Sequence, residues 1–425
     1  MNRRIFIKTT GLVAGVSAIS PSLGAETFVQ NTKDGIIPAE VIKAIRARIK
    51  PVTAEERLLR IEHARKLMGE NPEGTGKLDA LLMEGGTSLN YFSGARWGRS
   101  ERLFAMILPM KGEPFFIAPK FEESRAKEQT GNAQVYCWEE NENPYELIAK
   151  VFKEKNFLNG TLGIEETTRY FVTENIQKII PTLKIKSGTV VTAGCRGVKT
   201  AHEIELMQIA NDIAAEVYKA AVKQLKEGMS ENEFGNIISN LFNEFETPGG
   251  ALVLFGEASA HPHGLVKEMR LKQNDIVLMD GGCEVEGYES DITRMAVFGT
   301  ATDKMKKNFD IVRKAQDEGL KAAKPGVEAC TVDAAARKII TDNGYGPGYK
   351  YFTHRLGHGI GMDGHEWYYL VGGNKYILNP GNMFSNEPGI YIPGEFGIRL
   401  EDEMLITETG AKLLLPQQSG LEKMF

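Results

Sequence analysis

The sequence is poor in residues that mark several common classes of protein. Its 425 residues include only seven histidines and three tryptophans, and its four cysteines form no C-x-x-C pair. Widely spaced cysteines argue against a thiolate zinc or redox site; three disulfide pairings of the four remain open beside free thiols. A formal net charge of -5 provides no concentrated basic face for nucleic acid. No uninterrupted apolar run reaches the ~20 residues of a membrane-spanning helix.

The first residues are typical of an export signal. Arg3 and Arg4 form a twin-arginine pattern, followed by a mild apolar run over residues 10–19 and by small residues near Ala25. Such signals are read by receptors and then removed. We therefore expect a signal peptide over 1–25 and an exported, periplasmic or extracytoplasmic protein; the alternative is a disordered cytosolic terminus with a chance arginine pair.

The length favours two domains, because one hydrophobic core seldom serves so many residues. After a linker with an N-terminal helical piece over 26–55, which continues as helix to about residue 68, short apolar runs alternate with helical segments. This alternation predicts a small α/β domain over 56–194. A second domain is expected over 195–425.

The second domain contains the same arrangement twice. Apolar residues at three- and four-residue steps predict a helix from residue 201 to about 225, and Ser230 with Glu233 forms a capping box for a second helix ending near 245. A second pair is expected over 303–323 and 331–342, each ended by turn residues. Each pair precedes a histidine-bearing loop and a predicted β-hairpin. We interpret this as a duplicated unit; chance recurrence of common elements is the alternative.

Each predicted hairpin carries two carboxylates. Asp280 and Asp291 flank a midpoint beside Gly287, and Glu387 and Glu401 flank Gly394. If the turns lie at these midpoints, each pair is directly opposed on adjacent strands, with side chains on one face. Four buried carboxylates brought together require cations.

A histidine-rich segment follows the second helix pair. His358 lies between glycines that allow close backbone approach, with His354 before it and His365 after it. Four carboxylates with one imidazole suit manganese, iron, cobalt or zinc. Two such ions sharing carboxylates would activate a bridging water for hydrolysis.

At these residues the chain resembles the pita-bread metallopeptidases, in their aminopeptidase P and prolidase branch. The matching segments are DGG at 280–282, SDITR at 290–294, HRLGHGIG at 354–361, GHE at 364–366, EPGIY at 387–391 and RLED at 399–402. The segment before them resembles the creatinase-type N-terminal domain, so the resemblance covers nearly everything after about residue 55. It implies an α+β fold: a pita-bread domain preceded by a smaller α/β domain.

The resemblance also implies roles for single residues. The metal ligands would be Asp280, Asp291, His358, Glu387 and Glu401. The catalytic residues would be His263, His354, His365, Glu387 and Arg399, of which Arg399 would support the active-site carboxylates. His261 competes with His263 for the loop histidine, and an ordinary surface arginine is the alternative for Arg399.

The resemblance implies a peptidase that hydrolyses Xaa-Pro bonds with two divalent ions, Mn²⁺ first among them, then Zn²⁺, Co²⁺ or Fe²⁺. The expected partner is a proline-containing peptide, and a homodimer or higher homo-oligomer is implied. Two alternatives remain: a metal-free, creatinase-like amidinohydrolase and a non-catalytic peptide-binding module. The three aromatic residues of WYY at 367–369 stand where relatives often carry proline, which predicts an unusual pocket wall. The sequence leaves open whether dipeptides, longer peptides or another Xaa-Pro-like amide is preferred.

Overall fold

The computed structural model describes residues 36–70 and 76–425. The expected signal peptide over 1–25 and the start of the linker lie outside these residues. Within them, no helix combines the length and apolar character that crossing a membrane requires. The four cysteines are free thiols.

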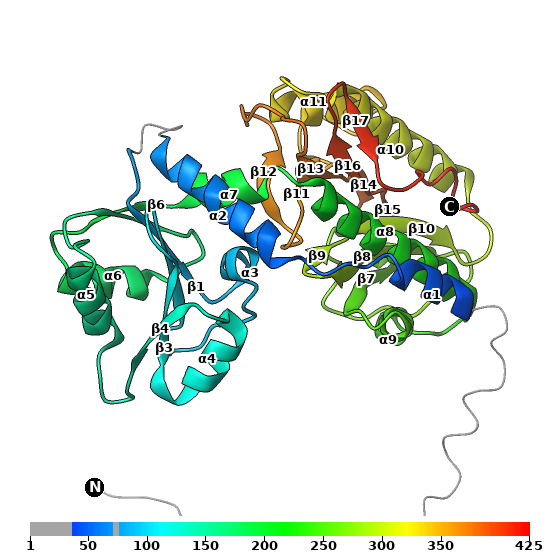
Figure 1. The fold of residues 1–425 in the computed structure, drawn as a ribbon. Helices are drawn as coiled ribbons and strands as arrows, with labels where there is room; N and C mark the ends of the chain where they lie inside the picture. The colour runs from blue at the N-terminus through cyan, green and yellow to red at the C-terminus, as the bar shows by residue number, and fades with distance from the viewer. Residues whose placement is uncertain (1–35, 71–75) are drawn as a thin grey trace, which may run out of the picture.

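The described chain forms two domains side by side (Figure 1). The helices of the first part are α1 (Ala39–Arg46), α2 (Ala54–Gly69), α3 (Thr87–Ser93), α4 (Glu123–Thr130), α5 (Pro144–Glu154), α6 (Tyr170–Ile179) and α7 (Thr189–Arg196). Its strands are β1 (Ala80–Glu84), β2 (Ala105–Pro109), β3 (Phe115–Pro119), β4 (Gln134–Trp138), β5 (Thr161–Ile164) and β6 (Lys184–Ser187).

The first domain is a three-layer α/β structure around one mixed sheet with strand order β4-β3-β2-β1-β5-β6. Alternate side chains of β1 point to opposite faces: Leu81 packs in the core under α2 and α3, whereas Leu82 packs in the core under α5 and α6. Because both faces are covered, the central strands β1, β2 and β3 are apolar on both sides and appear in the sequence as short continuous apolar runs.

The expected helical piece before this domain is two helices. Thr53 caps α2 through a capping box with Glu56, and Pro51 lies in the non-helical segment between α1 and α2. Proline and a new N-cap both end a continuous helix. The helix α1 packs on the second domain, where Ile42 and Ile45 contact the core that contains α8 (Ala201–Ala221).

The second domain contains the two expected helix pairs. Its helices are α8, α9 (Glu231–Glu244), α10 (Asp303–Ala322) and α11 (Ala329–Asp342). Its strands are β7 (Gly249–Phe255), β8 (Ile276–Val285), β9 (Tyr288–Glu289), β10 (Ile292–Val297), β11 (Gly357–Gly359), β12 (Glu366–Leu370), β13 (Met383–Asn386), β14 (Gly389–Ile392), β15 (Phe396–Arg399), β16 (Asp402–Ile406) and β17 (Ala411–Leu413). Ser230 and Glu233 form the predicted capping box of α9. The α+β fold is therefore confirmed.

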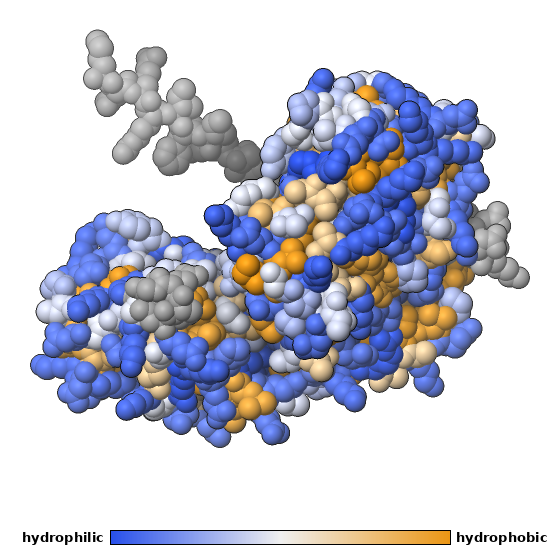
Figure 2. Space-filling view, turned by 90° about the horizontal axis from the view of Figure 1, so that it is seen from above, coloured by the Kyte–Doolittle hydropathy of each residue, from blue (hydrophilic) through white to orange (hydrophobic). Residues whose placement is uncertain are grey.

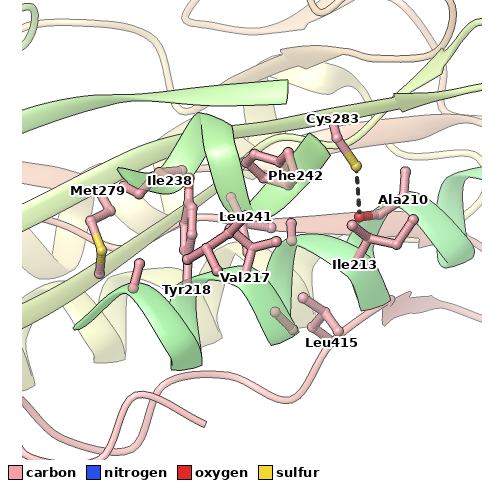
Figure 3. Packing of buried hydrophobic residues seen from close by; sticks show 14 of the residues in the cluster. Ala210, Ile213, Val217, Tyr218, Ile238, Leu241, Phe242, Met279, Cys283 and Leu415 are labelled. Carbon is pink, nitrogen blue, oxygen red and sulfur yellow. Dashed lines mark hydrogen bonds between the residues drawn. The ribbon is translucent and has the colours of Figure 1, made fainter. Parts of the chain in front are cut away.

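A tightly packed core holds the hairpin β8–β10 against the helices. Figure 3 shows Val217 and Tyr218 of α8 and Phe242 of α9 packed beneath β8, where the Cys283 thiol donates to the Ala210 carbonyl over 3.5 Å. Burying each large apolar side chain contributes about 1.5–3 kcal/mol. The core thereby fixes the strand that carries Asp280. On the face seen in Figure 2 the surface is mostly hydrophilic, with small separate apolar patches over both lobes.

Candidate metal centre

The first hairpin places its two aspartates on one face, but not directly opposite each other. Its turn consists of Glu286 and Gly287, both with positive φ (53° and 90°), as in the two-residue turns that glycine favours. A turn centred there pairs Asp280 with Thr293. The expectation that Asp280 faces Asp291 directly is wrong, because it needs a turn centred one residue earlier. Asp291 lies diagonally across from Asp280, and diagonal neighbours still share a face.

The second hairpin has the predicted centre. Gly394 has φ 79° in the turn between β14 and β15. Asn386 pairs with Asp402 just before Glu387, and Gly389 pairs with Arg399 just after it. The same register carried between these two pairs places Glu387 opposite Glu401.

The glycines around His358 are required by close backbone approach. A Cβ on Gly357 would lie 2.0 Å from the Ser385 carbonyl oxygen, and one on Gly359 would lie 1.9 Å from the Trp367 carbonyl oxygen. No side chain fits at such distances, so this prediction from the sequence is confirmed. The glycines let β11 pack tightly between β12 and β13, which fixes the position of His358.

The five expected ligands converge. The metal-binding atoms of three overlapping sets lie within 4.8 Å of one another in each set. The sets are Asp280, Asp291 and Glu401; His358, Glu387 and Glu401; and Asp291, His358 and His365. His358 Nε2 lies 3.3 Å from Glu387 Oε1 and 3.9 Å from Asp291 Oδ2. Shared members such as Glu401 are the arrangement that two adjacent cations require.

The electrostatics of this cluster are unfavourable for carboxylates without a cation. Burial raises the pKa of Asp291 and Glu401 well above the ordinary range, and the charges of neighbouring carboxylates raise both further. Burial also raises the pKa of Glu387 to about 8, with Arg399 opposing and Asp280 supporting the shift. For Asp280, burial acts upward, but the charge of Arg399 and hydrogen bonds outweigh it and lower the pKa. Cations among these groups would favour their ionised forms.

His358 is prepared as a neutral ligand. Burial lowers its pKa to about 3, and the charge of a protonated His365 would lower it further. Its Nδ1 lies 3.1 Å from the Gly359 carbonyl oxygen, which can only accept, so Nδ1 carries the proton. The lone pair of Nε2 is left facing the carboxylates, as metal-ligating histidines require. The donor set therefore fits two divalent cations of the manganese or zinc type.

Arg399 and His354 support the cluster from one side. Arg399 is buried, donating to Asp280 Oδ2 over 2.5 Å and to the Tyr391 hydroxyl over 3.1 Å. Its burial rules out the alternative that Arg399 is an ordinary surface arginine. His354 Nδ1 lies 2.8 Å from the Arg355 carbonyl oxygen, and its Nε2 lies 2.7 Å from the Tyr391 hydroxyl. Burial, with the charge of Arg399, lowers the pKa of His354 to about 4.

The cluster forms the floor of a cavity of about 160 Å³. His263 lines this cavity together with Pro262, whereas His261 is not among its lining residues. The His365 ring stacks on His358 with centroids 3.8 Å apart. Arg355 Nη2 lies 3.3 Å from His365 Nδ1. Because arginine can only donate, Nδ1 accepts and neutral His365 carries its proton on Nε2, which makes Nε2 a donor.

Several supporting residues had no assigned role in the sequence. Thr293 donates to Glu401 Oε2 over 2.7 Å. Glu403 accepts from the Asp291 backbone nitrogen over 2.8 Å and from Asn211 over 2.9 Å. Thr293 and Tyr391 lie inside the motifs at 290–294 and 387–391, so their position in these motifs could have indicated a role at the site. Nothing in the sequence indicated Glu403.

Comparisons with known proteins agree with this geometry. Residues 205–408 match the model of Metallopeptidase family M24, and residues 60–198 match the Creatinase/Prolidase N-terminal domain. The chain is 35% identical to the Xaa-Pro dipeptidase of Pyrococcus furiosus over 365 residues, covering 85% of this chain and 99% of that protein.

Two solved structures have the same fold over most of the chain. The dipeptidase PepE from Mycobacterium ulcerans superposes with a TM-score of 0.80 at 29% identity, covering 88% of this chain and 100% of that one. The prolidase from Thermococcus sibiricus gives 0.77 at 31% identity, covering 87% and 98%.

Proposed function

The chain belongs to Metallopeptidase family M24 and is a hydrolase, and from this premise we propose that it hydrolyses Xaa-Pro peptide bonds with two divalent cations. The observation that carries the proposal is the convergence of Asp280, Asp291, His358, Glu387 and Glu401 in overlapping sets within 4.8 Å. The preference for proline is supported by relatives named as an Xaa-Pro dipeptidase and a prolidase.

The cations would be held by these five side chains. When bound, they supply Lewis acidity and lower the pKa of a water molecule towards ~7. We propose Mn²⁺ first, because ligands dominated by carboxylate oxygens favour it.

The chain's own residues would move the proton and stabilise charge. Glu387 is the candidate for carrying a proton to the proline nitrogen, a tertiary amide nitrogen that must be protonated before it leaves. Nε2–H of His365, or the imidazole of His263, would donate to the oxyanion that develops on the scissile carbonyl. Arg399 would hold Asp280 in place.

Two other functions fit the fold less well. A metal-free, creatinase-like hydrolase has no need for four carboxylates in this arrangement. A non-catalytic peptide-binding module does not need a histidine held with a free lone pair toward carboxylates. We further propose that the protein is exported and forms a homo-oligomer. Leu265 and Val266, two exposed apolar side chains close to His263 in the chain, support a contact surface near the site.

Metal analysis combined with a substrate panel tests the proposed function. The purified protein, loaded with Mn²⁺, should hold about two ions per chain and release proline from Ala-Pro but not cleave Ala-Ala at a comparable rate. Two bound ions without cleavage of any Xaa-Pro peptide would contradict the proposed substrate. Cleavage in protein stripped of metal would contradict the metal dependence.

A further inference from the structure

A buried hydrogen-bond network joins the two domains beside the turn of the first hairpin. Arg60 lies on α2 of the first domain, Glu203 lies in the first turn of α8, and Tyr288 lies on β9, directly after the turn. All three side chains are almost fully buried. Charged groups at this depth are costly unless they satisfy one another with good geometry.

The three side chains hold one another in place. The Tyr288 hydroxyl donates to Glu203 Oε1 over 2.6 Å and accepts from Arg60 Nη2 over 2.8 Å. Burial, and then the charge of Glu203, raise the pKa of Tyr288, so the hydroxyl keeps the proton that it donates. Arg60 Nη1 is anchored on the Tyr91 carbonyl over 2.8 Å, and Glu203 Oε2 accepts from the Thr200 backbone nitrogen over 2.7 Å. The position of the Tyr288 hydroxyl is therefore fixed from both domains.

Tyr288 is three residues before the candidate metal ligand Asp291, and the chain between them is held by hydrogen bonds. The Glu289 backbone nitrogen donates to the Gly361 carbonyl over 2.7 Å, and the Ser290 backbone nitrogen donates to β8 over 2.9 Å. Metal sites need their ligands within about 0.5 Å of the productive geometry. A displacement of the tyrosine would pass along this short segment to the carboxylate of Asp291.

We propose that Tyr288 is a positioning residue for Asp291, through which the first domain sets how tightly the second domain binds its cations. This inference rests on the proposed function, because it needs Asp291 to be a metal ligand. Arg60 and Glu203 act through the tyrosine hydroxyl, and the tyrosine acts through the backbone of the hairpin. Removing a group that supports a metal ligand lowers metal affinity or activity by about 10–100-fold.

Titration of the metal-free protein with Mn²⁺ tests the inference. Tyr288→Phe keeps the packed ring and removes only the hydroxyl that Arg60 and Glu203 hold. Its Kd for Mn²⁺, measured by isothermal titration calorimetry, should be about tenfold higher than that of wild type. At saturating Mn²⁺, kcat for Ala-Pro should return close to the wild-type value with KM unchanged, because the groups that contact the substrate are intact. A merely structural role would leave the Mn²⁺ affinity where it is in wild type.

Arg60→Lys disturbs the same hydroxyl from the other domain. Lysine keeps the charge beside Glu203 but lacks the fork that reaches the Tyr288 hydroxyl and the Tyr91 carbonyl together, so Mn²⁺ binding should weaken as well. Residues in one network give non-additive effects. The double variant should therefore bind Mn²⁺ no more weakly than the weaker-binding single variant. Fully additive losses would overturn the shared route through the hydroxyl.

Tyr345→Phe is the matched control. The Tyr345 hydroxyl donates to Asn308 Oδ1 over the same 2.6 Å, in the second domain but outside this network. Its loss should lower the free energy of unfolding in urea and leave the Mn²⁺ affinity at the wild-type value. Wild-type Mn²⁺ affinity in Tyr288→Phe would overturn the inference, whatever its stability.

The same measurements separate this inference from the proposed function. If wild type binds Mn²⁺ but cleaves no Xaa-Pro peptide, the proposed substrate is wrong, while the Mn²⁺ affinities of Tyr288→Phe and Tyr345→Phe still decide the role of the tyrosine. If wild type binds no Mn²⁺, both fail.

Discussion

Lys199 Nζ donates a hydrogen bond to Glu366 Oε2 over 2.9 Å, although the two residues are 167 positions apart in the chain. Both side chains are almost fully buried, and Arg196 binds the other oxygen of the same carboxylate. Burial alone would raise the pKa of Glu366, but the positive charges of Lys199 and Arg196 lower it to about 2. The junction between the domains is therefore tied to the residue that follows His365.

Glu366→Gln should destabilise the protein strongly. The substitution leaves buried Lys199 without a counter-charge and leaves Arg196 with only the partly exposed Asp363 as its partner, and breaking a buried ion pair costs about 3–5 kcal/mol. The control is Glu395→Gln, whose pair with Lys304 has side chains 43% and 49% exposed and should cost at most about 1 kcal/mol. Urea unfolding measures both; similar small losses in the two variants would contradict a structural role for Glu366.

Asp291→Asn should abolish metal loading and turnover together. An amide has no charge to hold a cation. Removing a residue that only supports a metal ligand already lowers metal affinity or activity by about 10–100-fold, so removing a ligand should lower both by more. Metal content by mass spectrometry and hydrolysis of Ala-Pro are measured on the same sample. Asp310→Asn, on the exposed surface of α10, is the control. Full activity in Asp291→Asn would rule out Asp291 as a ligand.

The sequence predicted those parts of the fold that depend on local pattern. The turn at Gly394, the capping box of Ser230 and the glycines around His358 each have a local physical requirement that only certain residues meet. The pairing of Asp280 was predicted one turn position wrong, because register depends on turn type more than on the midpoint between two carboxylates. Contacts such as Glu366 with Lys199, or Arg60 with Tyr288, depend on how distant segments pack, and no spacing in the sequence encodes them.

The contribution of His354 to the stability of the metal-free protein should fall in mild acid. An unfolded imidazole takes up a proton as the pH falls through about 6.5, whereas buried His354 does so only near its pKa of about 4. At this residue the unfolded state therefore binds more protons in this window, and the stability that His354 contributes at pH 7 is lost as the pH falls towards 4. Between pH 7 and 5 His354 accounts for about 2 kcal/mol.

His354→Gln isolates this contribution, because His358 remains in both proteins. Urea unfolding of metal-free wild type and variant at pH 7 and 5 should show that the change in unfolding free energy from pH 7 to 5 is about 2 kcal/mol more favourable in the variant. Parallel changes in the two proteins would mean that His354 titrates equally in the folded and unfolded states. Asn343→Gln, an exposed substitution at the end of α11, should retain the wild-type pH dependence.

The proposed export should depend on the arginine pair at the N-terminus, and this dependence can be separated from charge. Twin-arginine signals are addresses read by a receptor, so replacing Arg3 and Arg4 by lysine keeps the positive charge but removes the recognised groups. In a bacterial host with this pathway, the unaltered precursor should appear in the periplasm, shortened by about 25 residues as expected for a cleaved signal. The Arg3→Lys, Arg4→Lys double variant should remain cytoplasmic at full length and still cleave Ala-Pro, because it leaves the folded domains untouched.

Lys8→Gln keeps the arginine pair and should be exported as the unaltered chain is. Equal distribution of the double variant and the unaltered chain would show that the arginine pair is not the signal.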